Sequence, residues 1–467
     1  MIAEDDLPRL HEAALRLLAE TGAVVRDADA LAGLAAHGAA VDGQRVRIPD
    51  RLIAEALAAA PAGYTVAGRR RALDLTVNQQ APPVLASASG PAFILDQGRQ
   101  RTGTLADLRQ AIALTHLSPN IQLHGVCVEA LDVPAERRTR VVLHAFVTGS
   151  DKAHEAWVGD GTDLEAAITV QEILYGAEWH ALPRLWTFLN STSPLQLSAE
   201  VSRAIRRLAS LGQPVSLTPC AMGGTTGPIT LAGLLALQHA ETLLGLVLTE
   251  LVRPGCPFLY GGTSSISSMR SGALLMGAPE YWSLTEATIR LGHWCGLPVR
   301  AGGALTDAHT PDAQASAESA LSLMSTLGCG REAAAAQAQV VLHAAGILSS
   351  FNCYSPAKFV IDDELITALR TAAAPIVVDE ENLALEALAN AGPGGNLLSA
   401  PHTKHHARDH ERSTLMQREP YETWRALGGR DLAAAAAQRA ADLLATYAPP
   451  DDLDPIVRRQ LDEYCLG

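Results

Sequence analysis

The chain has few aromatic residues, few lysines and no closely spaced pair of cysteines. Only 4% of its 467 residues are aromatic, and three of the 36 basic residues are lysines. Its seven cysteines are scattered and form no C-x-x-C pair, which favours reduced thiols over a disulfide framework. The formal net charge of −14 argues against nucleic acid or an anionic membrane surface as a partner.

A signal-peptide pattern and an uninterrupted membrane-length apolar run are also missing. The first residues, MIAEDDLPRLHEAALRLL, are acidic and then amphipathic, so we expect a cytoplasmic protein. The longest apolar stretch begins at Leu231 and is interrupted by Gln238, His239, Glu241 and Glu250. This interruption favours a buried helix over a membrane span.

The glycine-rich stretch CAMGGTTGPITLAG, which begins at Cys220, does not match a known phosphate-binding pattern. No lysine follows its glycines, and the spacing G-x-G-x-x-G is absent. Taken alone, the stretch predicts a turn between a strand and a helix.

From about residue 120, short runs rich in apolar and β-branched residues alternate with helical patterns. The candidate strands are 121–129, 152–158, 184–190, 214–219, 257–262, 298–303, 339–346 and 395–401. Helical patterns follow the first seven, for example at 197–211, 229–252 and 280–295. This alternation predicts an α/β fold, a (β/α)8 TIM barrel, with an open doubly wound sheet as the alternative.

The predicted barrel occupies residues 119–412 and carries an extension at each end. Residues 1–118 predict an N-terminal α+β extension of helices and small strands, and residues 413–467 a C-terminal helical extension. We expect these extensions to cap the barrel or to form the interface of a homo-oligomer.

The loops that follow the strands supply the candidate site, because barrel enzymes place their active sites at the C-terminal ends of the strands. In the sixth loop, Asp307 and His309 are the candidate catalytic groups. Asp312 could orient substrate or could simply be an acid at a helix N-terminus. Several aromatic residues lie on strands or just beyond them, and two or three of them around one pocket would bind a quaternary ammonium. The candidate substrate-binding residues are Trp157, Trp186, Asn190, Tyr260, Phe351, Tyr354 and Asp312.

Four histidines near the end of the predicted barrel have helical spacing: His402, His405, His406 and His410. Imidazoles on one helix face could bind zinc, but the sequence contains no H-E-x-x-H and no cysteine lies nearby. A solvated helix start is the alternative, and we expect no bound metal.

Beyond these features, the sequence resembles the trimethylamine methyltransferase family of corrinoid-dependent enzymes almost from end to end. The matching segments are HEAALRLLAETGAVV, DLPRL through VRIPDRLIAEAL, FILDQGRQRTGTLADL, CAMGGTTGPITLAG, LVRPGCPFLYGG, GAPEYW, TDAHTPDAQ, VIDDELI and APHTKHH. The resemblance implies a (β/α)8 barrel that transfers a methyl group from a methylated amine to the Co(I) corrinoid of a separate partner protein. No cofactor is then expected to be bound tightly to this chain.

Under that resemblance, the corrinoid would dock over the mouth of the barrel, where small residues leave room. The corrinoid-facing candidates are Gly223, Gly224, Thr225, Gly227, Gly261 and Gly262. The chain contains only the twenty ordinary residues, so it resembles the branch without pyrrolysine, whose members act on quaternary amines such as glycine betaine. The amides at 223–227, Arg270, Arg300 or His309 could receive a substrate carboxylate. Two alternatives stay open: a metal-dependent hydrolase or lyase, and a barrel that only binds an amine or a corrinoid protein.

Overall fold

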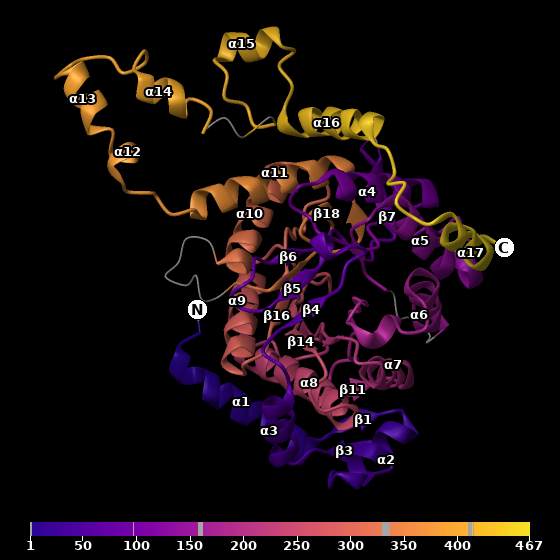
Figure 1. The fold of residues 1–467 in the computed structure, drawn as a ribbon. Coiled ribbons are helices and arrows are strands. Elements are labelled where there is room, and N and C mark those ends of the chain that lie inside the picture. The colour runs from indigo at the N-terminus through magenta and orange to yellow at the C-terminus, as the bar shows by residue number, and fades with distance from the viewer. Residues whose placement is uncertain (1, 97, 157–161, 329–336, 410–412, 414) are drawn as a thin grey trace.

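A parallel β-sheet surrounded by helices forms the centre of the molecule (Figure 1). The computed structural model describes residues 2–96, 98–156, 162–328, 337–409, 413 and 415–467. Five strands form the main sheet in the order β12 (Val215–Leu217), β14 (Phe258–Gly261), β16 (Val299–Gly302), β17 (Val340–Leu342) and β6 (Val84–Leu85). All four pairings within this sheet are parallel.

Further parallel contacts lie outside this five-stranded sheet. Strands β9 (Leu123–His124) and β10 (Ala153–His154) form a separate parallel pair. Single parallel bridges join Ala86 to Leu123, Glu155 to Trp186 and Leu189 to Leu217. The ladders therefore do not form one closed sheet, and the fold is mixed α/β.

The structure confirms most of the predicted strand positions and corrects one. Segment 184–190 takes part only through single bridges. The prediction of a strand at 395–401 is wrong: Leu398 is 79% exposed there, and the segment contains turns but no strand. Strand β6, from the predicted N-terminal extension, lies beside β17 instead. Composition misled the prediction, because two leucines between glycine and proline resemble a short strand even when they face solvent.

The helices form the outer layer, and the three cited as examples occur where the sequence predicts them. These are α7 (Ala199–Ser210), α8 (Leu231–Val252) and α9 (Pro279–Trp294). The other helices around the sheet are α4 (Leu105–Leu117), α5 (Ala135–Gly149), α6 (Thr162–Tyr175), α10 (Ala313–Leu327) and α11 (Pro356–Ala373). In the part of the chain that the structure describes, only α8 is long and apolar enough to span a membrane. Because 83% of its apolar window is buried inside the molecule, it is a core helix here, as predicted.

The N-terminal part contains both helices and small sheets. Helices α1 (Leu7–Arg16), α2 (Ala28–Ala36) and α3 (Asp50–Ala59) accompany β1 (Ala23–Val25), β2 (Ala40–Asp42) and β3 (Arg45–Arg47). Strand β1 also pairs in parallel with β11 (Gln196–Leu197), which connects this part to the chain before α7. Strands β4 (Tyr64–Val66) and β5 (Leu75–Val77) form a hairpin.

Short strands after the sheet strands build the loops above it. Strand β13 (Met222–Gly223) pairs with β15 (Ser265–Ile266). A second small sheet contains β18 (Ile347–Leu348), β19 (Cys353–Tyr354), β7 (Phe93–Asp96) and β8 (Arg99–Thr102).

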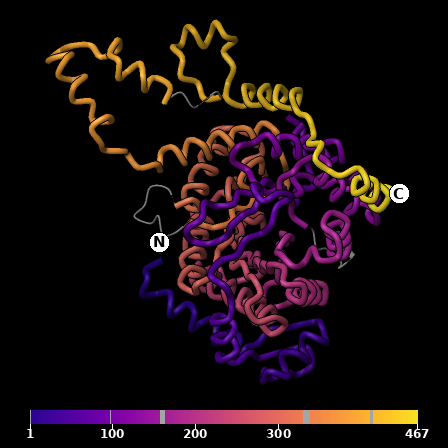
Figure 2. The backbone as a smooth tube through the Cα atoms, in the orientation of Figure 1, coloured from indigo at the N-terminus to yellow at the C-terminus, as the bar shows by residue number. Residues whose placement is uncertain are grey.

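The C-terminal part begins with an arm that projects from the body beyond α11 (Figures 1 and 2). It contains α12 (Glu380–Leu383), α13 (Leu385–Ala391), α14 (Pro401–His406) and α15 (Tyr421–Ala426). The chain then returns to the body, where α16 (Leu432–Thr446) packs on α11 and α17 (Pro455–Leu466) packs on α5. The domain boundaries at 118 and 412 stay a prediction.

Alternation along the strands divides the core into two regions. Leu259 of β14 belongs to an inner cluster with Val340 and Leu342, whereas its neighbours Phe258 and Tyr260 join the outer core with the helices. Successive side chains of a strand point to opposite faces. This alternation decides which side chains reach the interior of the sheet.

Candidate active site

Four polar side chains lie near the C-terminal ends of the parallel strands. They are Ser89 after β6, Glu155 after β10, Arg300 in β16 and His343 after β17. The Ser89 hydroxyl donates a hydrogen bond of 2.6 Å to Glu155 Oε1, and the Ser89 backbone N–H donates one of 3.2 Å to His343 Nδ1. Three separate strand ends thus meet in one polar cluster.

Glu155 is a buried carboxyl group that lacks a full set of partners. It is 4% exposed, and its Oε2 atom has no hydrogen-bond partner among the described residues. Burial raises the pKa of Glu155 to about 7, and the charge of Glu129 also raises it, while Ser89 and Arg300 act in the opposite direction. A carboxyl group of this kind changes its charge near neutral pH.

Arg300 is a buried cation that has no carboxylate partner in the described part of the chain. Its neighbours Val299 and Ala301 belong to the outer core, so alternation along β16 points the Arg300 side chain inward. Its contacts are weak: Nη1 lies 3.3 Å from the Gly262 carbonyl oxygen and 3.4 Å from the Thr263 hydroxyl.

Within the described residues, no carboxylate lies within 4.0 Å of this guanidinium, and its Nε has no partner. Burial lowers the pKa of Arg300 to about 10, which still leaves the group charged at neutral pH. The Arg300 guanidinium is therefore available to bind an anion, because a buried charge is favourable only when it is paired.

His343 is neutral and held in a strained backbone conformation. Burial and the nearby charge of Arg300 lower the pKa of His343 to about 3. Because Nδ1 accepts from the Ser89 N–H, the proton of the neutral ring lies on Nε2. The backbone φ of 53° at His343 is uncommon for a residue other than glycine. The ring of Phe351 lies 4.7 Å from the His343 ring.

The predicted catalytic pair, Asp307 and His309, supports this region from outside the polar cluster. Asp307 Oδ1 accepts hydrogen bonds from the Met276 backbone N–H at 2.8 Å and from the Ser350 hydroxyl. The exposed His309 ring bonds the Ser349 hydroxyl at 2.8 Å. Both groups therefore contact the turn that carries Phe351, and their assignment as catalytic groups stays a prediction.

The other predicted substrate-binding residues divide between core, surface and site. Trp186 is buried in the inner cluster beside the β4–β5 hairpin. The Tyr260 hydroxyl bonds His239 Nδ1 of α8 at 2.9 Å, so Tyr260 faces the helix layer instead of the mouth. Tyr354 packs near Phe359 in the outer core.

Of the remaining candidates, Asn190 is exposed and accepts a bond of 3.0 Å from Thr218. Asp312 is the N-cap of α10, where its carboxylate accepts from the Ala315 N–H at 3.1 Å. This geometry supports the helix-terminus alternative for Asp312.

Among the aromatic candidates, Trp157 lies outside the described residues. The ring of Phe351 adjoins the polar cluster through its contact with His343, and the backbone of Trp186 bridges to Glu155. Phe188, whose ring centre lies 6.0 Å from the Arg300 guanidinium carbon, is a second aromatic neighbour.

The predicted corrinoid-facing residues include glycines that give room to neighbouring parts of the chain. A Cβ on Gly261 would lie 2.6 Å from the Arg300 carbonyl oxygen, and one on Gly262 would lie 2.0 Å from the Gln238 side chain. A Cβ on Gly227 would lie 2.6 Å from Leu234 of α8, and one on Gly223 only 3.2 Å from the same side chain. These positions require small residues for internal packing.

Gly224 and Thr225 are exposed on the same loop. Gly224 has φ of 89°, which favours glycine. Their contact with a corrinoid stays a prediction.

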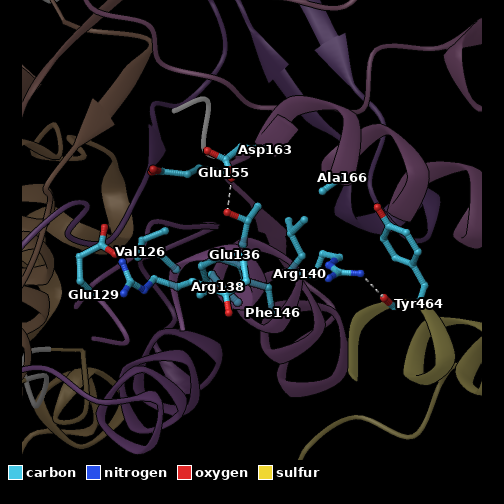
Figure 3. A pocket seen from close by; sticks show the side chains of 14 residues that line it. Val126, Glu129, Glu136, Arg138, Arg140, Phe146, Glu155, Asp163, Ala166 and Tyr464 are labelled. Carbon is cyan, nitrogen blue, oxygen red and sulfur yellow. Dashed lines mark hydrogen bonds between the residues drawn. The ribbon is translucent and has the colours of Figure 1, made fainter. Parts of the chain in front are cut away.

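A cavity of about 780 Å³ opens beside the polar cluster (Figure 3). Glu155 lines it together with Glu129, and residues of α5, α6 and α17 form the other walls. In Figure 3, Glu129 lies at one side and Tyr464 at the opposite side. Burial raises the pKa of Glu129 as well, although Arg138 opposes this change. The cavity is large enough for a small molecule.

From the sequence, Arg300 is one of several groups predicted to bind a substrate carboxylate. Ser89, Glu155 and His343 are not among the predicted site residues. Glu155 lies inside the predicted strand 152–158, and a charged residue in an apolar strand is a signal that could have identified it. Ser89 and His343 carry no such signal, because their roles depend on which strands are neighbours.

Comparison with known proteins agrees with this enzyme-like arrangement. The family model for trimethylamine methyltransferase (MTTB) matches residues 1–466. The chain is 32% identical to a glycine betaine methyltransferase of Desulfitobacterium hafniense, covering 99% of this chain and 96% of that protein. It is 31% identical to a proline betaine:corrinoid methyltransferase of Eubacterium limosum, covering 96% and 94%. It is 28% identical to the trimethylamine methyltransferase MttB of Methanosarcina thermophila, covering 97% and 95%.

Among solved structures, the monomethylamine methyltransferase MtmB of Methanosarcina barkeri shares the fold. The TM-score is 0.53 at 11% sequence identity, and the match covers 96% of this chain and 89% of that chain. The extent of the family match and the full-length relatives confirm the resemblance that the sequence motifs indicate. The chain therefore belongs to the trimethylamine methyltransferase family and is a corrinoid methyltransferase.

Proposed function

We propose that the protein takes a methyl group from a betaine-like quaternary amine and transfers it to the Co(I) corrinoid of a partner protein. The observation that carries this proposal is a pair of buried opposite charges that do not neutralise each other. Glu155 and Arg300 influence each other electrostatically, yet they form no ion pair with each other. Each has a buried polar atom without a partner among the described residues.

A zwitterion fits such a pair better than a simple cation does. A betaine carries a carboxylate, which Arg300 can bind, and a quaternary nitrogen, which the Glu155 carboxylate and nearby aromatic faces stabilise. Trimethylamine has no carboxylate and would leave Arg300 unpaired. The names of two relatives, a glycine betaine and a proline betaine methyltransferase, support the same substrate class.

The exposed loop around Gly224 suits a large planar partner group. Gly224 and Thr225 follow β12, so they lie at the same end of the strands as the polar cluster. A Cβ on Gly224 would lie 2.6 Å from Met269, whose side chain is mostly exposed. A corrinoid in its Co(I) state supplies the nucleophile that accepts the methyl group. The loop would hold it, and the buried cluster would align the substrate and exclude water.

Quaternary amines need no acid at this site. The nitrogen of a betaine leaves as a neutral tertiary amine, so no proton must be delivered to it. His343 carries no charge that would repel the cation, because burial keeps it neutral. The neutral state of His343 thus favours a substrate that already bears positive charge.

Three broader expectations belong to this proposal. The single bridges between Ala86 and Leu123, Glu155 and Trp186, and Leu189 and Leu217 connect neighbours that would complete a (β/α)8 barrel. A cytoplasmic location is part of the proposal and has no support beyond the sequence pattern. A homo-oligomer is supported by apolar side chains exposed on the arm, of which Ile376 is 90% and Val378 is 73% exposed.

The test is a substrate panel with added cob(I)alamin, followed by the change in its absorbance spectrum. Glycine betaine, proline betaine and carnitine are compared with tetramethylammonium, trimethylamine and dimethylglycine. We expect transfer from at least one betaine and much weaker transfer from tetramethylammonium, which lacks a carboxylate. Binding of betaines without any transfer would support the binding-only alternative, and transfer only from trimethylamine would refute the proposed substrate class.

A further inference from the structure

The arm carries a cluster of metal-ligating side chains that is separate from the candidate active site. Glu381 of α12 and His405 and His406 of α14 place one oxygen and two nitrogen atoms within 4.8 Å of one another. Their identities match the two-histidine, one-carboxylate set that binds zinc in many proteins. We propose, against the expectation of no bound metal, that these three residues bind a divalent transition-metal ion of the zinc class.

The first step of the argument is the orientation of His406. Its Nδ1 lies 2.6 Å from Asp409 Oδ2, a carboxylate that accepts the hydrogen of the ring. In the neutral ring, Nε2 is then unprotonated and carries a lone pair. A carboxylate on the far nitrogen of a metal-binding histidine fixes its ring and its protonation in this way.

The second step is what the Nε2 atom of His406 faces. This atom is shielded from solvent and has no hydrogen-bond partner in the described part of the chain. Its nearest acidic neighbour is Glu381 Oε1 at 3.7 Å. With the ring neutral, a nitrogen lone pair and a carboxylate oxygen are both acceptors, so a cation between them makes their approach favourable.

The third step is the geometry of the set. His405 Nε2 lies 3.6 Å from the same Glu381 oxygen. Zinc bonds of about 2.0–2.1 Å in a tetrahedral arrangement place ligand atoms roughly 3.4 Å apart. Small rotations of the exposed Glu381 and His405 side chains would close the difference. His402 supports the arrangement, because its Nε2 donates to the Glu381 backbone carbonyl at 3.0 Å and so holds α14 against α12.

The fourth step is the need for such a link. No residue of α12, α13 or α14 is buried, so the helices of the arm have no hydrophobic core of their own. Small segments without a core commonly depend on a metal or a disulfide for order. A bound ion would connect α12 to α14 across α13 and fix the shape of the arm.

A second cluster in the body provides a comparison. His11, His239 and Cys295 also lie within 4.8 Å of one another. In this second cluster the two histidine nitrogens already have a partner, because His11 Nδ1 and His239 Nε2 share a hydrogen bond of 2.9 Å. Burial also raises the pKa of the Cys295 thiol to about 12, so this thiol stays protonated. This cluster is a weaker metal site than the one on the arm.

The experiment uses the full chain without a polyhistidine tag, stripped with a chelator and titrated with Zn²⁺ by calorimetry and elemental analysis. The variants are the double change His405→Gln with His406→Gln, the single change Glu381→Gln, and His11→Gln for the second cluster. His37→Gln is the matched control, because His37 is an exposed histidine at the end of α2. Circular dichroism checks that each variant folds.

We expect one zinc ion per chain, an affinity at least about 100-fold weaker in the double variant, and a smaller loss in Glu381→Gln. The His37→Gln and His11→Gln variants should bind as the unchanged chain does. Zinc should also slow proteolysis within residues 374–409 of the unchanged chain and not of the double variant. The proposal is overturned if the unchanged chain binds no zinc, if the double variant binds equally well, or if only His11→Gln loses the ion.

Discussion

Replacement of Glu155 by glutamine should separate the charge of this residue from its shape. Glutamine is nearly isosteric and can still accept the hydrogen bond that the Ser89 hydroxyl donates at 2.6 Å. It cannot ionise, so it removes the buried negative charge that we assign to the binding of the substrate cation. The pKa of Glu155, raised by burial from 4.5 to about 7, sets the size of the effect.

The effect on stability has a definite sign. Below pH 4.5 the carboxyl group is protonated in the folded and unfolded chains, so it contributes no difference. As the pH rises through the folded pKa of about 7, the folded state loses the advantage of holding its proton. At about 1.4 kcal/mol per pKa unit, the ionised Glu155 destabilises the folded protein by about 3 kcal/mol above pH 7. Glu155→Gln should therefore raise the free energy of unfolding at pH 8 by up to this amount, and by less than about 1 kcal/mol at pH 5.

The effect on activity should be the opposite. If the ionised form binds the quaternary nitrogen, kcat/KM for a betaine should rise with pH around a midpoint near 7. The glutamine variant should be slow and nearly independent of pH in this range. Urea denaturation and initial rates of methyl transfer, each measured from pH 5 to 8.5, test both statements.

Glu250 is the matched control. Glu250 lies near the C-terminal end of α8, and burial likewise raises its pKa to about 7. Glu250→Gln should change the pH dependence of stability and leave the pH profile of methyl transfer unchanged. Equal pH profiles for the unchanged enzyme and Glu155→Gln, or a less stable Glu155→Gln protein at pH 8, would refute the reasoning.

Other predictions follow from the same site. Arg300→Gln should raise KM for a betaine by about 10- to 100-fold, because a hydrogen bond to a charged group contributes about 1.5–3 kcal/mol, and it should leave the rate with tetramethylammonium nearly unchanged. Asp307→Ala should lower both the melting temperature and kcat/KM, because it removes the hydrogen bonds to Met276 and Ser350. Asp312→Ala removes the N-cap of α10, so it should cost about 1 kcal/mol of stability and leave activity normal. At saturating substrate, glycine betaine should react more than about tenfold faster than dimethylglycine, and equal rates would contradict the leaving-group argument.

The sequence predicts the fold well where hydrophobic pattern alone determines structure. Strands β12, β14, β16 and β17 and helices α7, α8 and α9 lie within a few residues of their predicted ranges. Each is a long or strongly apolar segment whose burial the pattern makes plain. Strand β6 is only two residues long, and the small side chains that follow it at 86–90 give little signal. Its place beside β17 depends on a pairing between distant parts of the chain, which periodicity cannot reveal.

The candidate site is less predictable, because it depends on which way each side chain points. Tyr260 and Arg300 both lie on predicted strands, but alternation sends Tyr260 toward α8 and Arg300 into the interior. A shift of one residue in either strand would exchange these roles. Composition shows that an aromatic or a cation is present, and only the register shows whether it reaches the substrate.

The same register supports the substrate class that we propose, a zwitterion that carries both charges. Arg300 and Glu155 come from strands on different sides of β17 and β6, and each is buried without a direct ionic partner among the residues that the structure describes. If they were close enough to pair, the site would be neutral and would attract neither end of a betaine. Held apart, each charge destabilises the free protein, and a ligand that satisfies both recovers that energy on binding. Under the proposed function, a ligand with one charge would satisfy one group and leave the other unpaired, so the separation would select for a substrate that carries both.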